Sequence, residues 1–171
     1  SSGPASRKSK TTSDPIAEAA RLHFRVPYLY PIQRFVISNI LEEKNQIVLL
    51  PTGAGKSLCF QLPARIVDGP TVVVVPLLSL LADQLERCRG AGLRVEALRG
   101  GQDPQVRARV LGKLRAGDVD ILFTTPETLS LVGRDSGGLH WLVNASIAHL
   151  VVDEAHCLAE WGESFRPAYL E

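Results

Sequence analysis

Short runs with apolar side chains on both faces recur along the chain, and they limit the possible folds more than any other feature. Each run is rich in Val, Ile and Leu and is bounded by turn-forming residues. A strand with apolar side chains on both faces has to be covered from both sides, which is typical of parallel strands between helices. The runs are QIVLL at 46–50, TVVVV at 71–75, RVEAL at 94–98, DILFT at 120–124 and AHLVVD at 148–153. They predict a mostly parallel sheet with helices on both faces.

Helical patterns alternate with these runs. Asp14 and Pro15 suit the N-cap and the first position of a helix, and apolar residues then recur near helical spacing. Two later segments end in glycine, as crossover helices commonly do. The predicted helices cover 14–24, 32–44, 77–92 and 103–117, with one short helix within 136–143. The alternation of strand and helix predicts an α/β domain.

Length and composition place the chain among globular domains. Its 171 residues suffice for one domain with one core, and 45% hydrophobic and 22% charged residues are ordinary values. The net charge of +1 exerts no general attraction on nucleic acid or acidic membranes, so any site for a polyanion must be local. The apolar runs are too short to cross a bilayer. We therefore expect a single soluble domain.

The ends of the chain and its cysteines suggest its context. Residues 1–14 are small, polar and basic, and they predict a disordered tail before a folded domain at 15–171. Cys59, Cys88 and Cys157 form no CxxC pair, which indicates a reducing, intracellular compartment and no metal cluster. We expect Cys59 and Cys157 to be buried as small apolar residues. The absence of Met suggests a piece of a longer protein.

The segment VLLPTGAGKSLCFQLPA at 48–64 joins a strand pattern to a helix pattern through a glycine loop. Such a loop directs backbone N–H groups at phosphate oxygens, and the helix adds the positive end of its dipole. Lys56 would reach the β- and γ-phosphates of a nucleotide, and the Ser57 hydroxyl would hold Mg²⁺. Leu50 stands where the general pattern has glycine, and the alternative interpretation is a chance turn before a helix. The predicted nucleotide-binding residues of the loop are Thr52, Gly53, Ala54, Gly55, Lys56 and Ser57.

Asp153 and Glu154 follow the last apolar run, where they would lie at the carboxyl edge of a parallel sheet. A carboxylate at that edge can meet a Mg²⁺ held by a neighbouring phosphate loop, which is the role that we predict for Asp153. Glu154 would orient and activate the water that attacks the γ-phosphorus. With Lys56, these carboxylates are the predicted catalytic residues. Taken alone, such a pair is most often solvated surface charge.

PTGAGKS together with DEAH resembles the ATP site of superfamily-two helicases, in which PTG replaces the distal glycine, so Leu50 fits that pattern. DEAHCLAEWGESFRPAYLE at 153–171 resembles the RecQ family of DNA helicases, whose DEAH box runs directly into an aromatic-rich loop. KSLCFQLPA, VVVVPLLSLLADQ and TTPE resemble further motifs of that family. The likeness covers about residues 22 to 171.

The resemblance implies a RecA-like P-loop NTPase domain, the first of two such domains in an ATP-dependent DNA helicase. ATP and Mg²⁺ would be its cofactors, and its partners would be single-stranded or partly duplex DNA and a second RecA-like domain. Joined to that domain, which would bring an arginine finger, it would couple ATP hydrolysis to 3'–5' strand separation. It would act in a bacterial cytoplasm or nucleoid, or in a eukaryotic nucleus. The alternatives are a non-catalytic nucleotide- or DNA-binding module and a DEAD/DEAH-type RNA helicase.

The resemblance also assigns residues that would contact the base of the nucleotide. Gln33 would read the edge of adenine, since a side-chain amide both donates and accepts hydrogen bonds. Val26 and Tyr30 stand where the family has a stacking aromatic residue and an arginine. Tyr30 or Arg34 would then be the substitute stacking surface. Base recognition therefore departs from the family pattern.

An aromatic and basic loop follows the DEAH box. In the resembling family it contacts single-stranded DNA and reports that contact to the ATP site through the DEAH histidine, here His156. Aromatic faces stack on bases without reading sequence, and an arginine can meet a phosphate. The predicted DNA-contacting and coupling residues are His156, Trp161, Phe165, Arg166 and Ser79. The alternatives are that Trp161 and Phe165 fill a core, and that Ser79 and Thr125 only cap helices.

Overall fold

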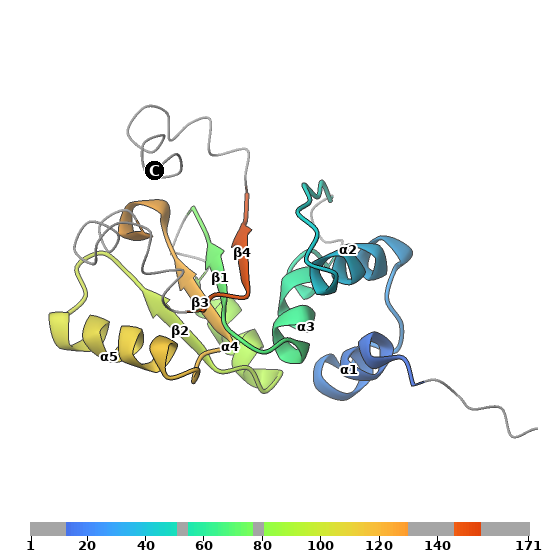
Figure 1. Ribbon diagram of the computed structural model, residues 1–171, viewed down its shortest axis with the longest axis horizontal. Coiled ribbons are helices and arrows are strands. Elements are labelled where there is room, and N and C mark those ends of the chain that lie inside the picture. The colour runs from blue at the N-terminus through green and yellow to red at the C-terminus, as the bar shows by residue number, and fades with distance from the viewer. Residues whose placement is uncertain (1–12, 51–54, 77–80, 130–145, 155–171) are drawn as a thin grey trace, which may run out of the picture.

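A computed structural model of the chain describes residues 13–50, 55–76, 81–129 and 146–154. In these residues the chain forms a parallel sheet with helices on both sides (Figure 1). The strands are β1 Thr71–Val74, β2 Val95–Leu98, β3 Ile121–Thr124 and β4 His149–Val152. Their order across the sheet is β2-β3-β1-β4, and every neighbouring pair is parallel. The predicted α/β class and the parallel pairing of these strands are confirmed.

Helices cover both faces of the sheet, which explains why its central strands are apolar throughout. β1 and β3 are buried along their whole length. Val72 and Val74 of β1 lie in one cluster with side chains of α5 (Pro104–Arg115). Val73 of β1, and Val75 directly after it, lie in the opposite cluster, with α3 (Leu58–Ile66) and α4 (Leu81–Gly90). Successive side chains of a strand point to opposite faces, so one apolar run fills both layers of the core.

An outer layer of two helices packs on α3, away from the sheet. These are α1 (Pro15–Phe24) and α2 (Pro31–Leu41), and their apolar faces share a buried cluster with Leu62 of α3. The predicted helices of the first half of the chain are therefore confirmed. α4 and α5 confirm the described parts of the predicted crossover helices, whereas the short helix predicted within 136–143 lies outside the described residues. None of the helices in the described ranges is long and apolar enough to cross a membrane.

Asp14 begins α1 as the sequence predicts. Its carboxylate accepts hydrogen bonds from the backbone N–H groups of Ile16 and Ala17 at 3.2 and 3.3 Å. These N–H groups belong to the first turn, where a helix has no internal acceptor for them. Asp14 also forms an ion pair with Arg34 of α2. One side chain therefore caps the first helix and ties it to the second.

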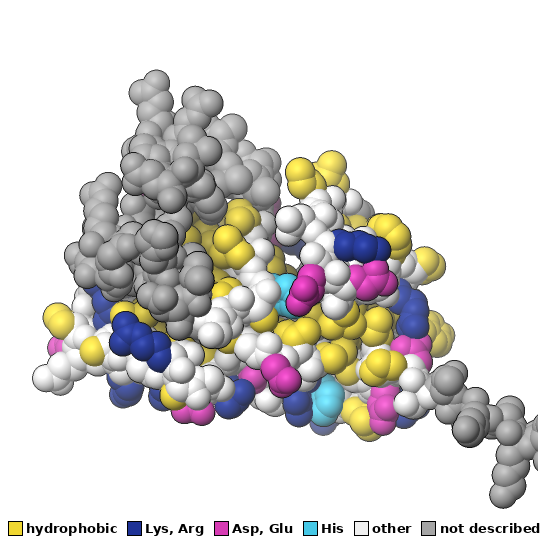
Figure 2. Space-filling view, viewed as in Figure 1, with side chains coloured by type: hydrophobic (Ala, Val, Ile, Leu, Met, Phe, Trp, Pro, Cys, Tyr) yellow, Lys and Arg dark blue, Asp and Glu magenta, His cyan; other side chains and the backbone are white. Residues whose placement is uncertain are grey.

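The predicted strand at 46–50 is wrong for this structure, because no strand forms there. Ile47 and Leu49 have exposed fractions of 92% and 91%. Figure 2 shows apolar side chains standing out from the surface where this segment lies. The Gln46 side chain instead bonds to α2, by donating to the Val36 carbonyl at 2.9 Å and by accepting from Asn39 at 3.0 Å. An extended segment becomes a strand only when a neighbour takes its backbone hydrogen bonds, and within the described ranges none does.

We expect Leu62→Ala to lower the free energy of unfolding by about 2–5 kcal/mol, because the change leaves a cavity in a fully buried cluster. Leu49→Ala is the matched control, and it should change the same quantity by less than about 0.5 kcal/mol because its side chain is in water. Urea unfolding followed by circular dichroism measures both variants. Equal losses would show that the segment at 46–50 is packed in solution.

Candidate functional site

The carboxyl end of β4 carries Asp153 and Glu154, as the sequence predicts. The Asp153 backbone N–H donates to the Val74 carbonyl at 2.9 Å and continues the pairing of β4 with β1 by one residue. Glu154 then takes a left-handed conformation with φ of 54°, and its N–H donates to the Asp153 carboxylate at 3.0 Å. A residue with a side chain adopts this conformation at a cost of about 1–2 kcal/mol. The turn places both carboxylates at one edge of the sheet.

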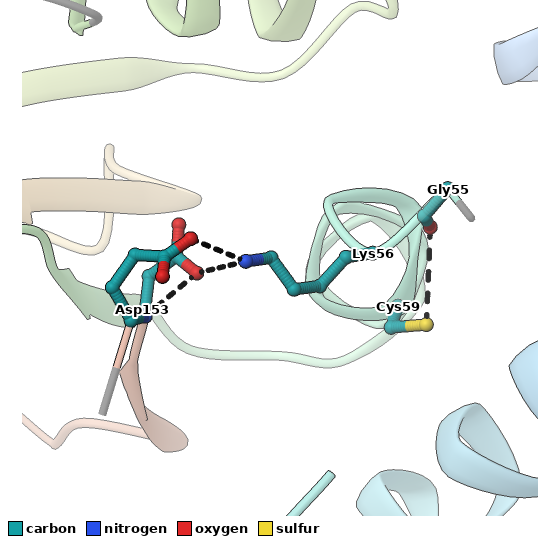
Figure 3. A network of polar contacts seen from close by, with 5 residues as sticks. Gly55, Lys56, Cys59 and Asp153 are labelled. Carbon is teal, nitrogen blue, oxygen red and sulfur yellow. Dashed lines mark hydrogen bonds and ion pairs between the residues drawn. The ribbon is translucent and has the colours of Figure 1, made fainter. Parts of the chain in front are cut away.

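Lys56 reaches both of these carboxylates from the start of α3 (Figure 3). Its Nζ lies 2.8 Å from Glu154 Oε1 and 3.1 Å from Asp153 Oδ1. The Lys56 side chain is 39% exposed and that of Asp153 is 12% exposed, so water reaches the cation more easily than the acid. The hydrogen bond that Lys56 donates to Glu154 raises the pKa of Lys56; burial opposes this, and the Asp153 carboxylate adds to it. The structure therefore brings the three predicted catalytic residues together.

Gly55 precedes Lys56 and is the point where the phosphate loop meets the rest of the domain. Its φ of 72° lies in the left-handed region that favours glycine. A Cβ atom at this position would lie 2.2 Å from Gln33 Nε2, which is closer than any real contact. The Gly55 carbonyl accepts from the Leu58 backbone N–H and from Gln33 Nε2, both at 3.2 Å, and more weakly from Cys59 Sγ at 3.9 Å. Both conformation and space therefore require glycine here.

Gln33 occupies the third position of α2, and its side chain is buried with an exposed fraction of 4%. Its Oε1 accepts from the Tyr30 backbone N–H at 3.0 Å, while its Nε2 donates to Gly55. The amide predicted to read a base thus lies against the phosphate loop. Sequence reasoning missed this contact, because the two residues are 22 positions apart and no local pattern relates them.

The residues proposed as a stacking surface differ in their exposure and in their contacts with other side chains. The Tyr30 side chain is exposed beside the N-terminus of α2. Arg34 is held in its ion pair with Asp14. Val26 packs against the cluster shared by α1, α2 and α3. Tyr30 is therefore the better placed of the two substitutes, because stacking there breaks no ion pair.

Several predicted site residues lie outside the described residues, and the structure bears on neither their placement nor their role. They are Thr52, Gly53, Ala54, Ser79, His156, Trp161, Phe165 and Arg166. Cys157 also lies outside the described residues. Cys59 is buried as predicted, and this burial raises the pKa of its thiol. Thr125 acts as a helix cap, since its Oγ1 accepts from the Thr128 N–H at 3.3 Å.

The donor atoms at the sheet edge suit a hard cation such as Mg²⁺. Ser57 stands at the N-cap of α3, and its hydroxyl makes no capping bond to that helix in the described structure. Among the described residues, no group of three or more His, Cys, Asp or Glu side chains could hold a metal ion. Mg²⁺ does not need such a cage, since it commonly binds to one or two carboxylates, phosphate oxygens and water. Asp153 and Ser57 fit that kind of site.

Comparison with known proteins places the chain among helicases. A family model described as DEAD/DEAH box helicase matches residues 30–171. The ATP-dependent DNA helicase RecQ of Synechocystis sp. is 40% identical over 147 residues, which cover 86% of this chain and 29% of that protein. The ATP-dependent DNA helicase Q4 of Mus musculus is 39% identical over 176 residues, which cover 98% of this chain and 14% of that protein. The chain thus spans less than a third of these relatives.

Solved structures support the fold. A hypothetical ATP-dependent RNA helicase from Sulfolobus tokodaii matches with a TM-score of 0.65 and 23% identity, over 86% of this chain and 43% of that one. The DUF1998 helicase MrfA bound to DNA and AMPPNP matches with a TM-score of 0.64 and 20% identity, over 86% of this chain and 21% of that one. At such identities the likeness concerns the fold alone. The predicted RecA-like α/β fold is confirmed.

We expect Glu154→Gln to lower the pKa of Lys56, since the hydrogen bond that Lys56 donates to the Glu154 carboxylate is the largest cause of its raised value. In the wild type the ion pair stabilises the fold fully below the ordinary lysine value of 10.5. That stabilisation is lost as the pH rises through the higher folded-state pKa. An NMR titration of the Lys56 side chain measures the shift. Glu96→Gln, which removes the partner of Lys113, is the control and should leave the Lys56 titration unchanged. A Lys56 midpoint that stays the same in Glu154→Gln contradicts the assignment.

Proposed function

The chain belongs to the DEAD/DEAH box helicase family, and we propose that it is the ATP-binding motor domain of a RecQ-type DNA helicase. One observation carries the proposal: Lys56 Nζ lies within 3.1 Å of both Asp153 and Glu154. This contact gathers a cation for phosphates and acids for a metal ion and a water molecule at the carboxyl edge of a parallel sheet, and these are the groups that phosphoryl transfer in P-loop proteins uses. The RecQ names of the relatives support DNA as the substrate.

Each of the three charged residues has a distinct role in this proposal. Lys56 would bind the β- and γ-phosphates of ATP, for which its long flexible side chain suits it. Asp153 and the Ser57 hydroxyl would hold Mg²⁺, which when bound neutralises charge on the transferring phosphoryl group. Glu154 would accept a proton from the attacking water. Its exposed carboxylate, 42% accessible, can meet a water molecule from solvent.

The proposal extends to domain limits and partners. Residues 15–171 would be the motor domain, preceded by a tail at 1–14. A second RecA-like domain would complete the motor, and together they would separate DNA strands in the 3'–5' direction inside the cell. That the curated relatives are several times longer than this chain supports a further domain. Adenine would stack on Tyr30, with Gln33 beside it, and the loop with Trp161, Phe165 and Arg166 would contact single-stranded DNA, coupled to ATP through His156.

Two variants of the full-length helicase test the assignment of the site. Lys56→Ala should weaken ATP binding by at least about tenfold, because each hydrogen bond to a charged group contributes about 1.5–3 kcal/mol. Glu154→Gln should keep ATP bound but lower the hydrolysis rate by roughly 10²–10⁴, since an amide cannot accept the proton. Calorimetry and a phosphate-release assay measure these effects.

Lys113→Ala is the matched control for the loss of a charge. Lys113 also forms an ion pair, with Glu96 at 2.7 Å, and its side chain is 46% exposed, close to the value for Lys56. It should bind and hydrolyse ATP as the wild type does. The proposal is wrong if Lys56→Ala keeps wild-type affinity and turnover.

Trp161→Ala and Phe165→Ala in the full-length helicase should leave ATP affinity intact while single-stranded DNA loses most of its stimulation of hydrolysis. Loss of one stacked base contact, about 1–3 kcal/mol, should weaken DNA binding without abolishing it. Tyr28→Ala, at an exposed aromatic residue outside the loop, is the control. Stimulation by RNA in place of DNA would favour an RNA helicase. A joint loss of thermal stability and ATP binding would mean that these aromatic residues fill a core.

A further inference from the structure

An open groove of about 370 Å³ lies along the outer edge of β2, between the last turn of α4 and the last turn of α5. It is at the amino end of the strand, whereas Lys56 and Asp153 meet at the carboxyl edge of the sheet. We propose that this groove binds a short, extended and acidic segment of a partner protein, which adds to the sheet beside β2. The groove is thus separate from the proposed nucleotide site.

The backbone of β2 leaves hydrogen-bonding groups open at this edge. Among the described strands β2 pairs only with β3, and on that side the Arg94 carbonyl accepts from the Ile121 N–H at 3.2 Å. Neighbouring residues of a strand direct their N–H and C=O groups to opposite sides. Those of Val95, which lines the groove, therefore point away from β3. Val95 thus offers one donor and one acceptor to the backbone of an added strand.

Gln102 closes the same edge further along β2. Its Nε2 donates to the Ala97 carbonyl at 3.0 Å, and its Oε1 accepts from the Arg99 N–H at 3.0 Å. Ala97 comes two positions after Val95, so its carbonyl also faces outward, and Gln102 occupies the acceptor that a longer added strand would use. An open strand edge pairs readily with other chains, and such a cap limits that pairing. The groove therefore accepts only a short segment, at the start of β2.

The charges around the groove favour an acidic ligand. Three basic residues and two acidic residues line it, which leaves one positive charge in excess; they are Arg89, Arg94, Lys113, Glu96 and Asp118. Arg94 pairs with Asp120 at 3.0 Å, and Lys113 pairs with Glu96 at 2.7 Å. Arg89 is exposed, and no described acidic residue forms an ion pair with it. Arg89 is therefore the cation that an incoming carboxylate meets.

The two walls of the groove determine the pattern of the ligand. Arg89 belongs to α4, on the face of the sheet where the Val95 side chain is buried. Lys113 belongs to α5, on the opposite face, where it bonds to Glu96. Side chains of an added strand alternate between these faces. The one that faces Arg89 should be acidic, whereas the next meets a lysine that Glu96 already neutralises. Pairing through backbone groups suits a peptide and not a nucleic acid.

Fluorescence anisotropy of the labelled peptide Thr-Val-Glu-Val-Thr with the full-length helicase tests this inference. Arg89→Glu should weaken binding by about three- to tenfold, because repulsion replaces attraction at an exposed site. Arg87→Glu is the matched control, since it makes the same change in the same helical turn outside the groove, and it should leave the affinity unchanged. Equal losses in both variants, or no binding to the wild type, would overturn the inference. Displacement of the peptide by a single-stranded DNA oligonucleotide would overturn it as well.

Glu96→Gln tests the groove through a gain of affinity, which damage to the fold cannot produce. It removes a negative charge and releases Lys113, so it should tighten binding of Thr-Val-Glu-Glu-Val-Thr by about two- to fivefold. Methylation of the backbone nitrogens of either peptide should abolish binding, because it removes the donors for the Val95 carbonyl. Unchanged affinity in either measurement would overturn the inference.

Discussion

Parallel pairing of the strands is the constraint on which the rest of the structure depends. Parallel neighbours cannot be joined by hairpins, so the chain has to return across the sheet after each strand, and between β1 and β2 and between β2 and β3 it does so as the helices α4 and α5. Helices on both faces bury strands such as β1 and β3 completely, which leaves the core no polar face. The carboxyl ends of all the strands lie on one edge. Lys56 and Glu154 meet at that edge although 98 positions separate them in the sequence.

Much of this could be predicted from the sequence, because it depends on local chemistry. Apolar runs without a polar face imply burial on both sides, and four of them form strands. Asp14 with Pro15 marks the start of α1, and its carboxylate caps the helix in the way its residue type favours. A glycine loop before Lys56 and the acids after an apolar run both indicate residues at the carboxyl edge of the sheet, so the sequence places them near one another. These predictions succeed because each needs only residues that are neighbours in sequence.

The failures concern contacts between segments that are distant in sequence. The run at 46–50 has the composition of a strand, but a strand also needs a partner edge, and composition carries no information about that edge. Gln33 looks like a residue on the solvent face of a helix until α2 packs on α3, which buries its amide against Gly55. Tertiary packing decides both outcomes. A polar residue at a helix start is compatible with capping, base recognition or a tie to a loop.

The ion pairs of Lys56 determine how a nucleotide can enter the site under the proposed function. One ammonium faces two carboxylates, so negative charge is already in excess before any phosphate arrives. Asp153 is fixed by the β-ladder and by the Glu154 N–H, whereas Lys56 ends in a flexible, partly exposed side chain. The cation is therefore the partner that moves. When Lys56 turns to the phosphates, Asp153 loses its counter-charge in a place that is only 12% exposed. A largely enclosed carboxylate without a partner is costly, and a second cation beside Asp153 would restore its counter-charge. This is the place that we propose for Mg²⁺.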